Sequence, residues 1–181
     1  MINTAHTTST DRNLSTISMT SPIGRLDIVA RAEAIVSIWF EIDGDGRRRD
    51  DAVPVAPGEH PLLDRAVTQL EEYFDGERTE FDLPLDPVGT PFQQQAWAAL
   101  RRIPYGETIS YGQQAVMLGD RKKSRAVGAA NGRNPIPIVV PCHRVVGSNG
   151  HLTGFAGGLD TKAWLLDHER SVADRLPPTG S

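Results

Sequence analysis

Apolar residues recur in two patterns along the chain: strand-like runs, most of them in the first half, and helical spacing in both halves. Residues 25–31 and 34–40 are rich in β-branched or aromatic side chains, and the short gap between them predicts a β-hairpin. A further strand is expected at 80–85. Apolar residues recur at helical spacing over 62–74, and Gly76 stands where a helix C-cap is expected.

The second half contains short helical patterns separated by turns that contain proline or glycine. The first, 92–100, follows a Thr-Pro pair that suits a helix N-cap and its first residue. The second, 110–118, starts at a capping serine and ends at Gly119, and a short turn leads to the third, 123–130. Two short helices joined by a tight turn that contains glycine predict a helix-turn-helix.

These patterns predict an α+β fold in two parts. We expect a disordered Ser/Thr-rich tail at residues 1–16 and a small N-terminal α/β domain with an antiparallel sheet over 17–88. A mostly helical, winged-helix-like C-terminal domain with the helix-turn-helix is expected over 89–181. The boundary falls in a segment rich in proline and glycine, and the apolar-free stretch 43–51 predicts an exposed loop.

The net charge of −4 conceals a division between the halves. Residues 1–90 carry 8 basic and 17 acidic side chains, a net charge of −9, whereas residues 91–181 carry 11 and 6, a net charge of +5. A nucleic-acid surface would therefore belong to the second half. Basic residues surround the third helical pattern: Arg121, Lys122, Lys123, Arg125 and Arg133.

That third helix carries little side-chain bulk, since Ala126, Gly128 and Ala129 are among its residues. Small residues allow a backbone to approach a partner closely, and the surrounding charges suit phosphates. Because the helix lacks the long polar side chains that read the major groove, the pattern favours the minor groove. A small-residue helix packed inside the domain, with its charges solvated, is an open alternative.

Composition also limits the classes of protein. The single cysteine excludes an internal disulfide and a cysteine-rich zinc site, and the histidines show no metal-ligand spacing, so we expect no metal. No apolar run approaches the roughly 18 residues of a membrane span, and the N-terminus lacks signal-peptide features. We therefore expect a cytoplasmic protein with no membrane partner.

The candidate chemistry lies at the single cysteine. The apolar, proline-flanked stretch 134–141 predicts a buried extended segment that ends at Cys142, followed by His143 and Arg144. A lone cysteine is usually a small buried hydrophobic residue, but here an imidazole can accept the thiol proton and Arg144 favours the thiolate. A free thiol is only about 3% thiolate at pH 7. Three carboxylates of the last helix could orient His143: Asp160, Asp167 and Glu169.

The motif Pro141-Cys142-His143-Arg144-Val145 resembles the active-site signature of the O6-alkylguanine-DNA alkyltransferases. Over roughly residues 90–170 further motifs fall in the order found in that family: Phe92-Gln-Gln, Ile103-Pro-Tyr-Gly-Glu-Thr108, Ser110-Tyr111, Arg125-Ala-Val-Gly128, Asn134-Pro135 and Gly157-Gly158-Leu159. The first half resembles the family only in layout and in Ser21-Pro-Ile-Gly24.

The resemblance implies a role for each matching residue. Cys142 would accept the alkyl group, His143 would be its base through a water, and Glu169 would orient His143. Arg125 would enter the base stack to hold out the flipped nucleotide, and Tyr111 would crowd its phosphate and assist proton transfer to guanine N3. The implied DNA surface is Arg125, Ala126, Gly128, Ala129 and Tyr111. Asn134 would hold the turn beside the helix, and the implied pocket residues are Val145, Phe155, Ala156 and Gly157.

The family's activity is the irreversible, stoichiometric transfer of an alkyl group from O6-alkylguanine, and also O4-alkylthymine, after the nucleotide is flipped through the minor groove. The resemblance implies a single-turnover enzyme without cofactor or metal, a monomer on double-stranded DNA, in a bacterial cytoplasm at the nucleoid. Cooperative binding is left open. Phe155 stands where many members have tyrosine, which leaves open the balance between small and bulky alkyl groups.

Three other classes of protein compete with this interpretation. Alkyltransferase-like lesion sensors resemble the chain but lack the cysteine that Cys142 provides. A helix-turn-helix transcription factor would need a sensor domain, which is not evident. A thiol hydrolase would lack an evident oxyanion site and a reason for the basic helix.

Overall fold

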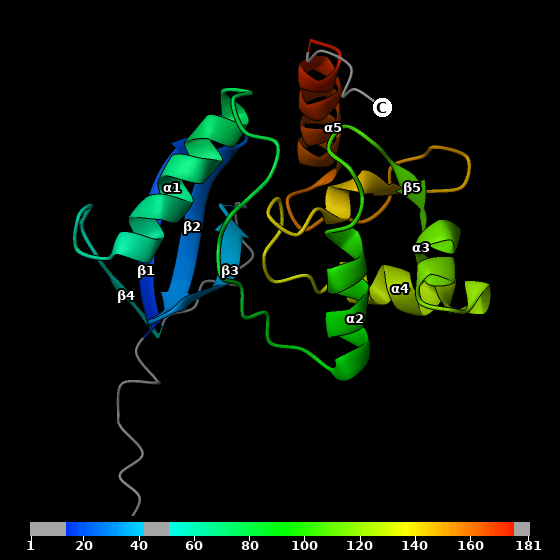
Figure 1. The fold of residues 1–181 in the computed structure, drawn as a ribbon, viewed down its shortest axis with the longest axis horizontal. Helices are drawn as coiled ribbons and strands as arrows, with labels where there is room; N and C mark the ends of the chain where they lie inside the picture. The colour runs from blue at the N-terminus through cyan, green and yellow to red at the C-terminus, as the bar shows by residue number, and fades with distance from the viewer. Residues whose placement is uncertain (1–13, 42–50, 176–181) are drawn as a thin grey trace, which may run out of the picture.

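The computed structural model describes residues 14–41 and 51–175. They form a sheet with one helix on it, beside a half made mainly of helices (Figure 1). The predicted loop at 43–51 lies outside the described residues except for its last residue, and so does the predicted tail as far as residue 13.

The sheet has the strand order β3-β2-β1-β4. Its strands are β1 (Leu14–Ser21), β2 (Gly24–Arg31), β3 (Ala34–Phe40) and β4 (Ala52–Pro54). The predicted hairpin is confirmed, because β2 pairs antiparallel with β3. β1 pairs antiparallel with β2 and parallel with β4.

The tail prediction is wrong for residues 14–16, which begin β1. Leu14, Ile17 and Met19 are buried at 4%, 8% and 7% exposure, and mostly serine and threonine lie between them. That polar composition resembles a disordered segment. Only pairing with β2 gives the strand's apolar side chains a core to enter.

Helix α1 (Pro61–Phe74) packs on the sheet as its spacing predicts. The side chain of His60 caps its N-terminus by accepting a hydrogen bond from the Leu63 amide. At the other end Gly76 has a φ of 77°, the left-handed conformation that favours glycine after a helix. The buried face includes Leu63, Leu70 and Tyr73.

The strand predicted at 80–85 is not formed. Leu85 makes only an isolated bridge to Ile35, and the Ile35 amide donates to the Pro84 carbonyl at 2.8 Å. Proline has no amide to continue a ladder. The segment covers part of the free edge of β3 instead.

The second half is helical, as predicted. Its elements are α2 (Pro91–Leu100), β5 (Ile109–Ser110), α3 (Tyr111–Met117), the 3-10 turn η2 (Arg121–Lys123), α4 (Ser124–Asn131), the 3-10 turn η3 (Cys142–Arg144), β6 (Val145–Val146) and α5 (Leu159–Ala173). Capping boxes at Thr90 and Ser110 start α2 and α3 at the predicted places. The pair α3 and α4, joined through η2, forms the predicted helix-turn-helix.

The stretch before Cys142 is buried as predicted, but it is not extended. The Val140 amide donates to the Ile136 carbonyl at 2.9 Å, and Ile138 has a φ of 74°. The amide group of Asn134 closes this turn, donating to Val140 O and accepting from the Ile136 amide. Prolines exclude a helix here but do not enforce a straight segment.

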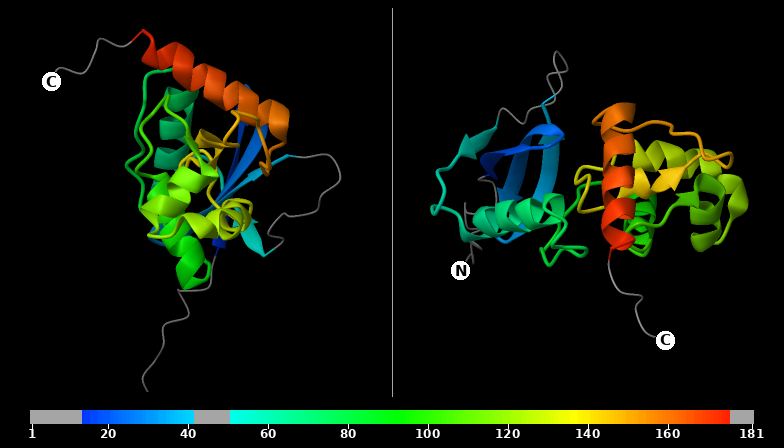
Figure 2. Two further views of the ribbon diagram at one scale, coloured as in Figure 1. Left: turned by 90° about the vertical axis from the view of Figure 1, so that its right-hand side faces the viewer. Right: turned by 90° about the horizontal axis from the view of Figure 1, so that it is seen from above.

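The two halves share one hydrophobic core. Leu26 and Leu70 from the sheet half belong to the same cluster as Trp97 and Leu165 from the helical half, and so does Cys142. In the view from above, α5 runs between the sheet half and the other helices (Figure 2). Over residues 14–41 and 51–175, no helix is long and apolar enough to cross a membrane.

Candidate active site and nucleic-acid surface

Cys142 opens the turn η3 and is 8% exposed. Burial raises the pKa of its thiol, and this outweighs a hydrogen bond with the Asn134 side chain and the positive charge of Lys162, which both lower it. The resting sulfur is therefore a thiol, and a base must remove its proton during reaction.

The neighbouring imidazole can serve as that base. His143 has no exposed surface, and its Nε2 lies 2.7 Å from Oε1 of Glu169. Burial lowers the pKa of His143 although the Glu169 carboxylate works in the opposite direction, so the ring is neutral at pH 7. Its Nδ1 is buried and has no hydrogen-bond partner among the described residues.

Glu169 is surrounded by donors. Its Oε1 accepts from Tyr73 Oη at 2.8 Å and from Arg144 Nη2 at 3.0 Å, and its Oε2 accepts from Arg144 Nε at 2.8 Å and from the Gly106 amide at 3.1 Å. Burial alone would raise the pKa of Glu169, but the hydrogen bond from His143 and the hydrogen bonds and charge of Arg144 lower it well below its usual range.

This environment decides the tautomer of His143. An ionised carboxylate only accepts hydrogen bonds, so Nε2 of His143 carries the ring proton. The lone pair then lies on Nδ1, which is the nitrogen without a partner. A neutral imidazole held in this way can accept one proton, and the carboxylate behind it stabilises the imidazolium that results.

The three carboxylates that the sequence left open are now distinguished. Asp160 and Asp167 are exposed, and Asp167 faces Arg170 at 3.7 Å on the surface. Glu169 is fully buried and makes the contact with His143. Because α5 lies between the halves, this carboxylate also reaches Tyr73 of α1.

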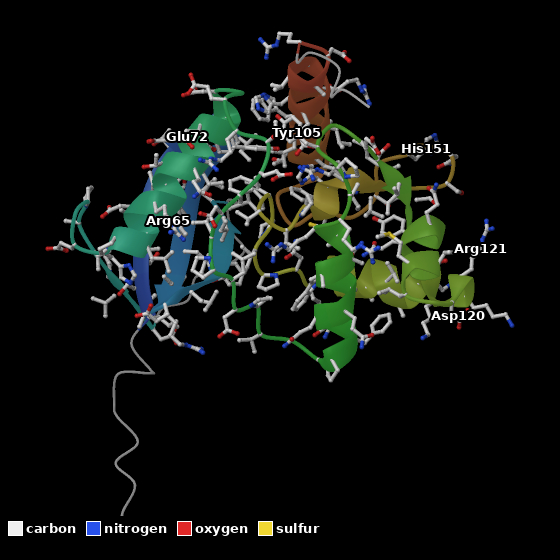
Figure 3. All side chains as sticks on the ribbon, in the orientation of Figure 1. Arg65, Glu72, Tyr105, Asp120, Arg121 and His151 are labelled. Atoms are coloured by element: carbon white, nitrogen blue, oxygen red, sulfur yellow. The ribbon has the colours of Figure 1, made fainter. Side chains whose placement is uncertain are left out.

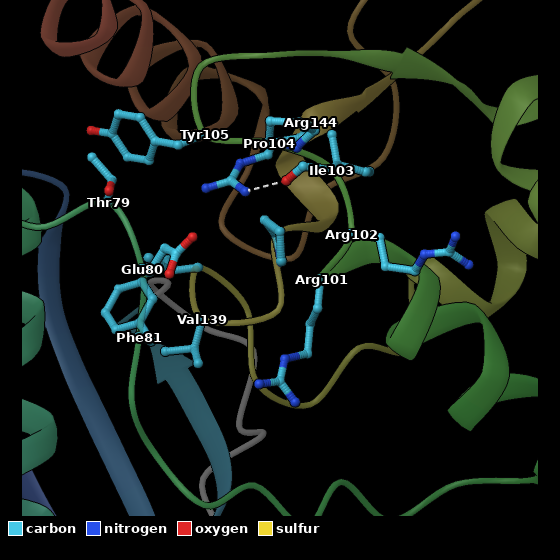
Figure 4. Close-up of a pocket in the computed structure, with 12 residues that line it drawn as sticks. Thr79, Glu80, Phe81, Arg101, Arg102, Ile103, Pro104, Tyr105, Val139 and Arg144 are labelled. Atoms are coloured by element: carbon cyan, nitrogen blue, oxygen red, sulfur yellow. Dashed lines mark hydrogen bonds between the residues drawn. The ribbon is translucent and has the colours of Figure 1, made fainter. Parts of the chain in front are cut away.

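Arg144 does not act as the sequence predicted. Its guanidinium turns away from the thiol to pair with Glu169, and its Nη1 donates to the Ile103 carbonyl at 2.7 Å (Figure 4). It also lies 5.5 Å from the ring centroid of Tyr105, whose pKa is raised to about 12 by burial and by Glu169. The positive charge that lowers the pKa of the Cys142 thiol comes instead from another residue.

That residue is Lys162, which sequence reasoning missed. It is fully buried, and its Nζ donates to the carbonyls of Val145 at 2.7 Å and Thr153 at 2.8 Å. Burial lowers the pKa of Lys162, while the nearby Cys142 raises it. The available signal was its position seven residues, about two helical turns, before Glu169, which places both on one face of α5.

Tyr111 links the active segment to the helix-turn-helix. It is the first residue of α3, and the pairing of β5 with β6 joins the start of that helix to the residues after Cys142. Its hydroxyl donates to Thr153 O at 3.2 Å and accepts from Thr153 Oγ1 at 3.1 Å. A Cβ added to Gly128 of α4 would lie 3.7 Å from the Tyr111 ring.

Helix α4 presents small and basic residues to solvent. Arg125, Ala126 and Ala129 are exposed, whereas Val127 and Ala130 are buried. The alternative of a helix packed wholly inside the domain is therefore wrong. Figure 3 shows Arg121, from the turn before α4, at the end of the molecule farthest from α1. The exposed basic residues of the turn η2 and the start of α4 are Arg121, Lys122, Lys123 and Arg125. Arg133 is also exposed, but it follows the other end of α4 and lines a cavity with residues of β3.

Of the predicted pocket residues, Phe155 and Ala156 line a cavity of about 540 Å³ together with Asn134. Val145 and Gly157 do not line this cavity. Val145 is fully buried, and Gly157 lies beside Phe155. Within the described ranges no three His, Cys, Asp or Glu side chains are grouped so that they could hold a metal ion.

Comparison with known proteins gives the same result for both halves. Residues 15–87 match the family model described as 6-O-methylguanine DNA methyltransferase, ribonuclease-like domain, and residues 91–171 match the model for its DNA binding domain. The methylated-DNA–protein-cysteine methyltransferase of Mycobacterium tuberculosis is 58% identical over 153 residues, which cover 84% of this chain and 90% of that protein. That of Methanosarcina acetivorans is 46% identical over 151 residues, covering 83% and 95%.

Solved structures agree with these relatives. The crystal structure of Mycobacterium tuberculosis O6-methylguanine methyltransferase superposes with a TM-score of 0.82 at 43% identity, covering 91% of this chain and 96% of that one. A crystal structure of Mycobacterium tuberculosis OGT in complex with DNA gives a TM-score of 0.78 at 44% identity, covering 88% and 94%.

Proposed function

The chain belongs to the 6-O-methylguanine DNA methyltransferase family, and from this membership we propose that it repairs O6-alkylguanine in DNA by moving the alkyl group irreversibly to Cys142. The observation that carries the proposal is the buried thiol next to an imidazole whose Nε2 is held by the ionised Glu169. O4-alkylthymine is a second substrate of the same chemistry.

The reaction is a displacement at carbon. Sγ of Cys142 attacks the alkyl carbon, the sulfur–carbon bond forms, and the bond from that carbon to O6 breaks. The thiol proton passes to Nδ1 of His143 through a water, and Tyr111 supplies one proton to N3 of the departing guanine. Proton transfer from His143 back to Tyr111 then restores both groups, so overall the thiol proton ends on guanine.

Two residues position the sulfur for this step. The Asn134 side chain closes the turn before Cys142 and lowers the pKa of the thiol, and Lys162 anchors the carbonyls of Val145 and Thr153, at the two ends of the segment 146–152. The positive charge of Lys162 also lowers the cost of forming the thiolate inside the protein. Lys162 is a positioning residue in this proposal.

A base inside the duplex offers sulfur no in-line path, so the nucleotide must be extruded, at a cost of a few kcal/mol. We assign this step to α4, which would enter the minor groove with its small residues while Arg125 fills the space left in the base stack. Tyr111 would crowd the phosphate of the extruded nucleotide. The exposed basic end of the molecule and the DNA complex of the mycobacterial relative support this assignment.

The decisive measurement is the intact mass of the protein after incubation with duplex DNA that contains O6-methylguanine. We expect the mass of one methyl group on Cys142, one per molecule, with no turnover beyond that. Cys142→Ala is the control: it should gain no mass but still bind the duplex, because the basic helix lies elsewhere. An unchanged mass in the unaltered protein would contradict the enzymatic proposal and favour a lesion sensor.

A further inference from the structure

The cavity of about 540 Å³ that Phe155 and Ala156 line is not built by the helical half alone. Ile38, Trp39 and Phe40 of β3 line it together with Asn134 and Phe155. A hydrogen bond holds the two sides in place, since the Ile38 amide donates to the Pro135 carbonyl at 2.9 Å. The edge of the N-terminal sheet is therefore one wall of this cavity.

Phe40 is the side chain of that wall that meets the helical half. Its ring centroid lies 5.5 Å from that of Phe155, and a Cβ added to Gly157 would come within 3.2 Å of its Cδ1 atom. The side chain of Trp39 packs in a separate cluster with Val29 and Val36, so it is not equivalent to Phe40.

Two of the residues that line the cavity also interact with the reactive groups. Asn134 lines it, and its side chain lowers the pKa of the Cys142 thiol. Phe155 also lines it and packs edge-on to the His143 ring, with 6.4 Å between centroids. A substituent on the alkyl carbon that is long enough to enter this cavity would meet the pair of aromatic rings, Phe40 and Phe155.

The size of the cavity exceeds what a methylated base requires. Its volume of about 540 Å³ lies within the roughly 300–1,000 Å³ of sites that enclose drug-sized ligands. Besides the two rings, Ile38, Pro135 and Pro137 contribute apolar side chains to its lining. Such a wall suits an aromatic or branched apolar substituent, and a methyl group does not extend to it.

We propose that Phe40, together with Phe155, forms an aromatic subsite for the distal part of bulky O6 substituents such as benzyl, so that the N-terminal sheet sets the preference among lesions. This inference rests on the proposed function, because it concerns the substrates of the same cysteine. It assigns the first half of the chain a part in substrate selection that its acidic composition does not indicate.

The test compares two substrates in one variant. The rate constants for alkylation of Cys142 are measured with duplexes that contain O6-benzylguanine or O6-methylguanine, for the unaltered protein and for Phe40→Leu. An aromatic pair contributes enough beyond its buried area for a roughly three- to tenfold effect, so the benzyl rate should fall by about that factor. The methyl rate should change less than about twofold on the same reasoning.

Two further variants control for packing. Phe81→Leu makes the same change at a partly buried phenylalanine of the same half that lines a different cavity (Figure 4), and it should alter neither rate. Phe40→Tyr keeps the ring and should keep the benzyl rate. Equal changes of both rates in Phe40→Leu, no change in either, or a Phe81→Leu effect of the same size and selectivity would overturn the subsite. Failure of the unaltered protein to react with either duplex would contradict the proposed function itself.

Discussion

At the scale of single residues, the active site depends on one carboxylate that is ionised although it is fully buried. Glu169 has no exposed surface, and donors from Tyr73, His143 and Arg144 replace its hydration. Removing one partner of a buried pair costs about 3–5 kcal/mol, since the other charge is left without compensation. The residue that orients the base is therefore also important for the stability of the fold.

We predict that Glu169→Gln lowers the free energy of unfolding at pH 7 by about 3 kcal/mol or more. The pKa of Glu169 is lowered by folding from its ordinary value of 4.5, so its contribution is complete above that pH and is lost as the pH falls toward the folded-state pKa. The difference in unfolding free energy between the unaltered protein and Glu169→Gln should thus shrink between pH 6 and pH 3. Urea denaturation at several pH values measures it.

Asp167→Asn is the matched control for this prediction, because Asp167 lies on the same helix with its side chain 76% exposed. It should change stability by no more than the few tenths of a kcal/mol typical of exposed pairs. A Glu169→Gln difference that stays constant with pH would show that the carboxylate is not ionised in the folded protein.

At the scale of elements, different helices place the reactive groups and the proposed DNA surface. Helix α4 is anchored by its buried side, where Trp97 Nε1 donates to the Ala130 carbonyl at 2.8 Å, and its exposed side carries Arg125. The active segment is fixed separately, by the Asn134 turn before Cys142 and by α5 behind His143. Substitutions on the outer side of α4 should therefore leave the thiol chemistry intact.

We predict that Arg125→Ala slows repair of O6-methylguanine in duplex DNA by about tenfold or more, the size expected when extrusion loses a few kcal/mol of support. Reaction with free O6-benzylguanine base should change less than about twofold, because a free base needs no extrusion. Arg170→Ala, at an exposed arginine of α5, serves as the control and should affect neither rate. Equal losses with both substrates would refute the role of Arg125 in extrusion.

At the scale of the whole molecule, charge is divided between the halves. The first 90 residues carry a net charge of −9 and the remainder +5, and the exposed basic cluster lies at the end away from α1 (Figure 3). A net negative protein can bind DNA in this way because its acidic half need not approach the phosphates, and salt screens charges more than about 10 Å apart.

We predict that affinity for duplex DNA falls steeply with salt, with the logarithm of the binding constant changing by roughly −0.9 per phosphate contact for each unit of log salt concentration. Lys122→Gln should make this slope shallower by about one, whereas Arg78→Gln in the acidic half should not change it. Fluorescence anisotropy over 50–300 mM salt provides the slopes. A flat salt dependence of the unaltered protein would be incompatible with a phosphate-based interface.

Local patterns in the sequence determined most elements. The hairpin of β2 and β3, the helices α1 and α2 and the helix-turn-helix were predictable, because caps, turns and apolar spacing act over a few residues. Strand β1 was not, since its serines and threonines resemble a tail until β2 pairs with it. The strand expected at 80–85 failed for the opposite reason: its composition suits a strand, but the chain there only covers the edge of β3.

The sequence by itself also singled out Cys142 and His143, because the chemistry lies in adjacent residues of one motif. Only the tertiary structure selected Glu169 over Asp160 and Asp167, turned Arg144 away from the thiol and brought Lys162 toward it. It also brought the edge of the first-half sheet to the cavity lined by Asn134 and Phe155. These contacts join residues that are far apart in the chain, and burial then sets their charges, so no local pattern contains them.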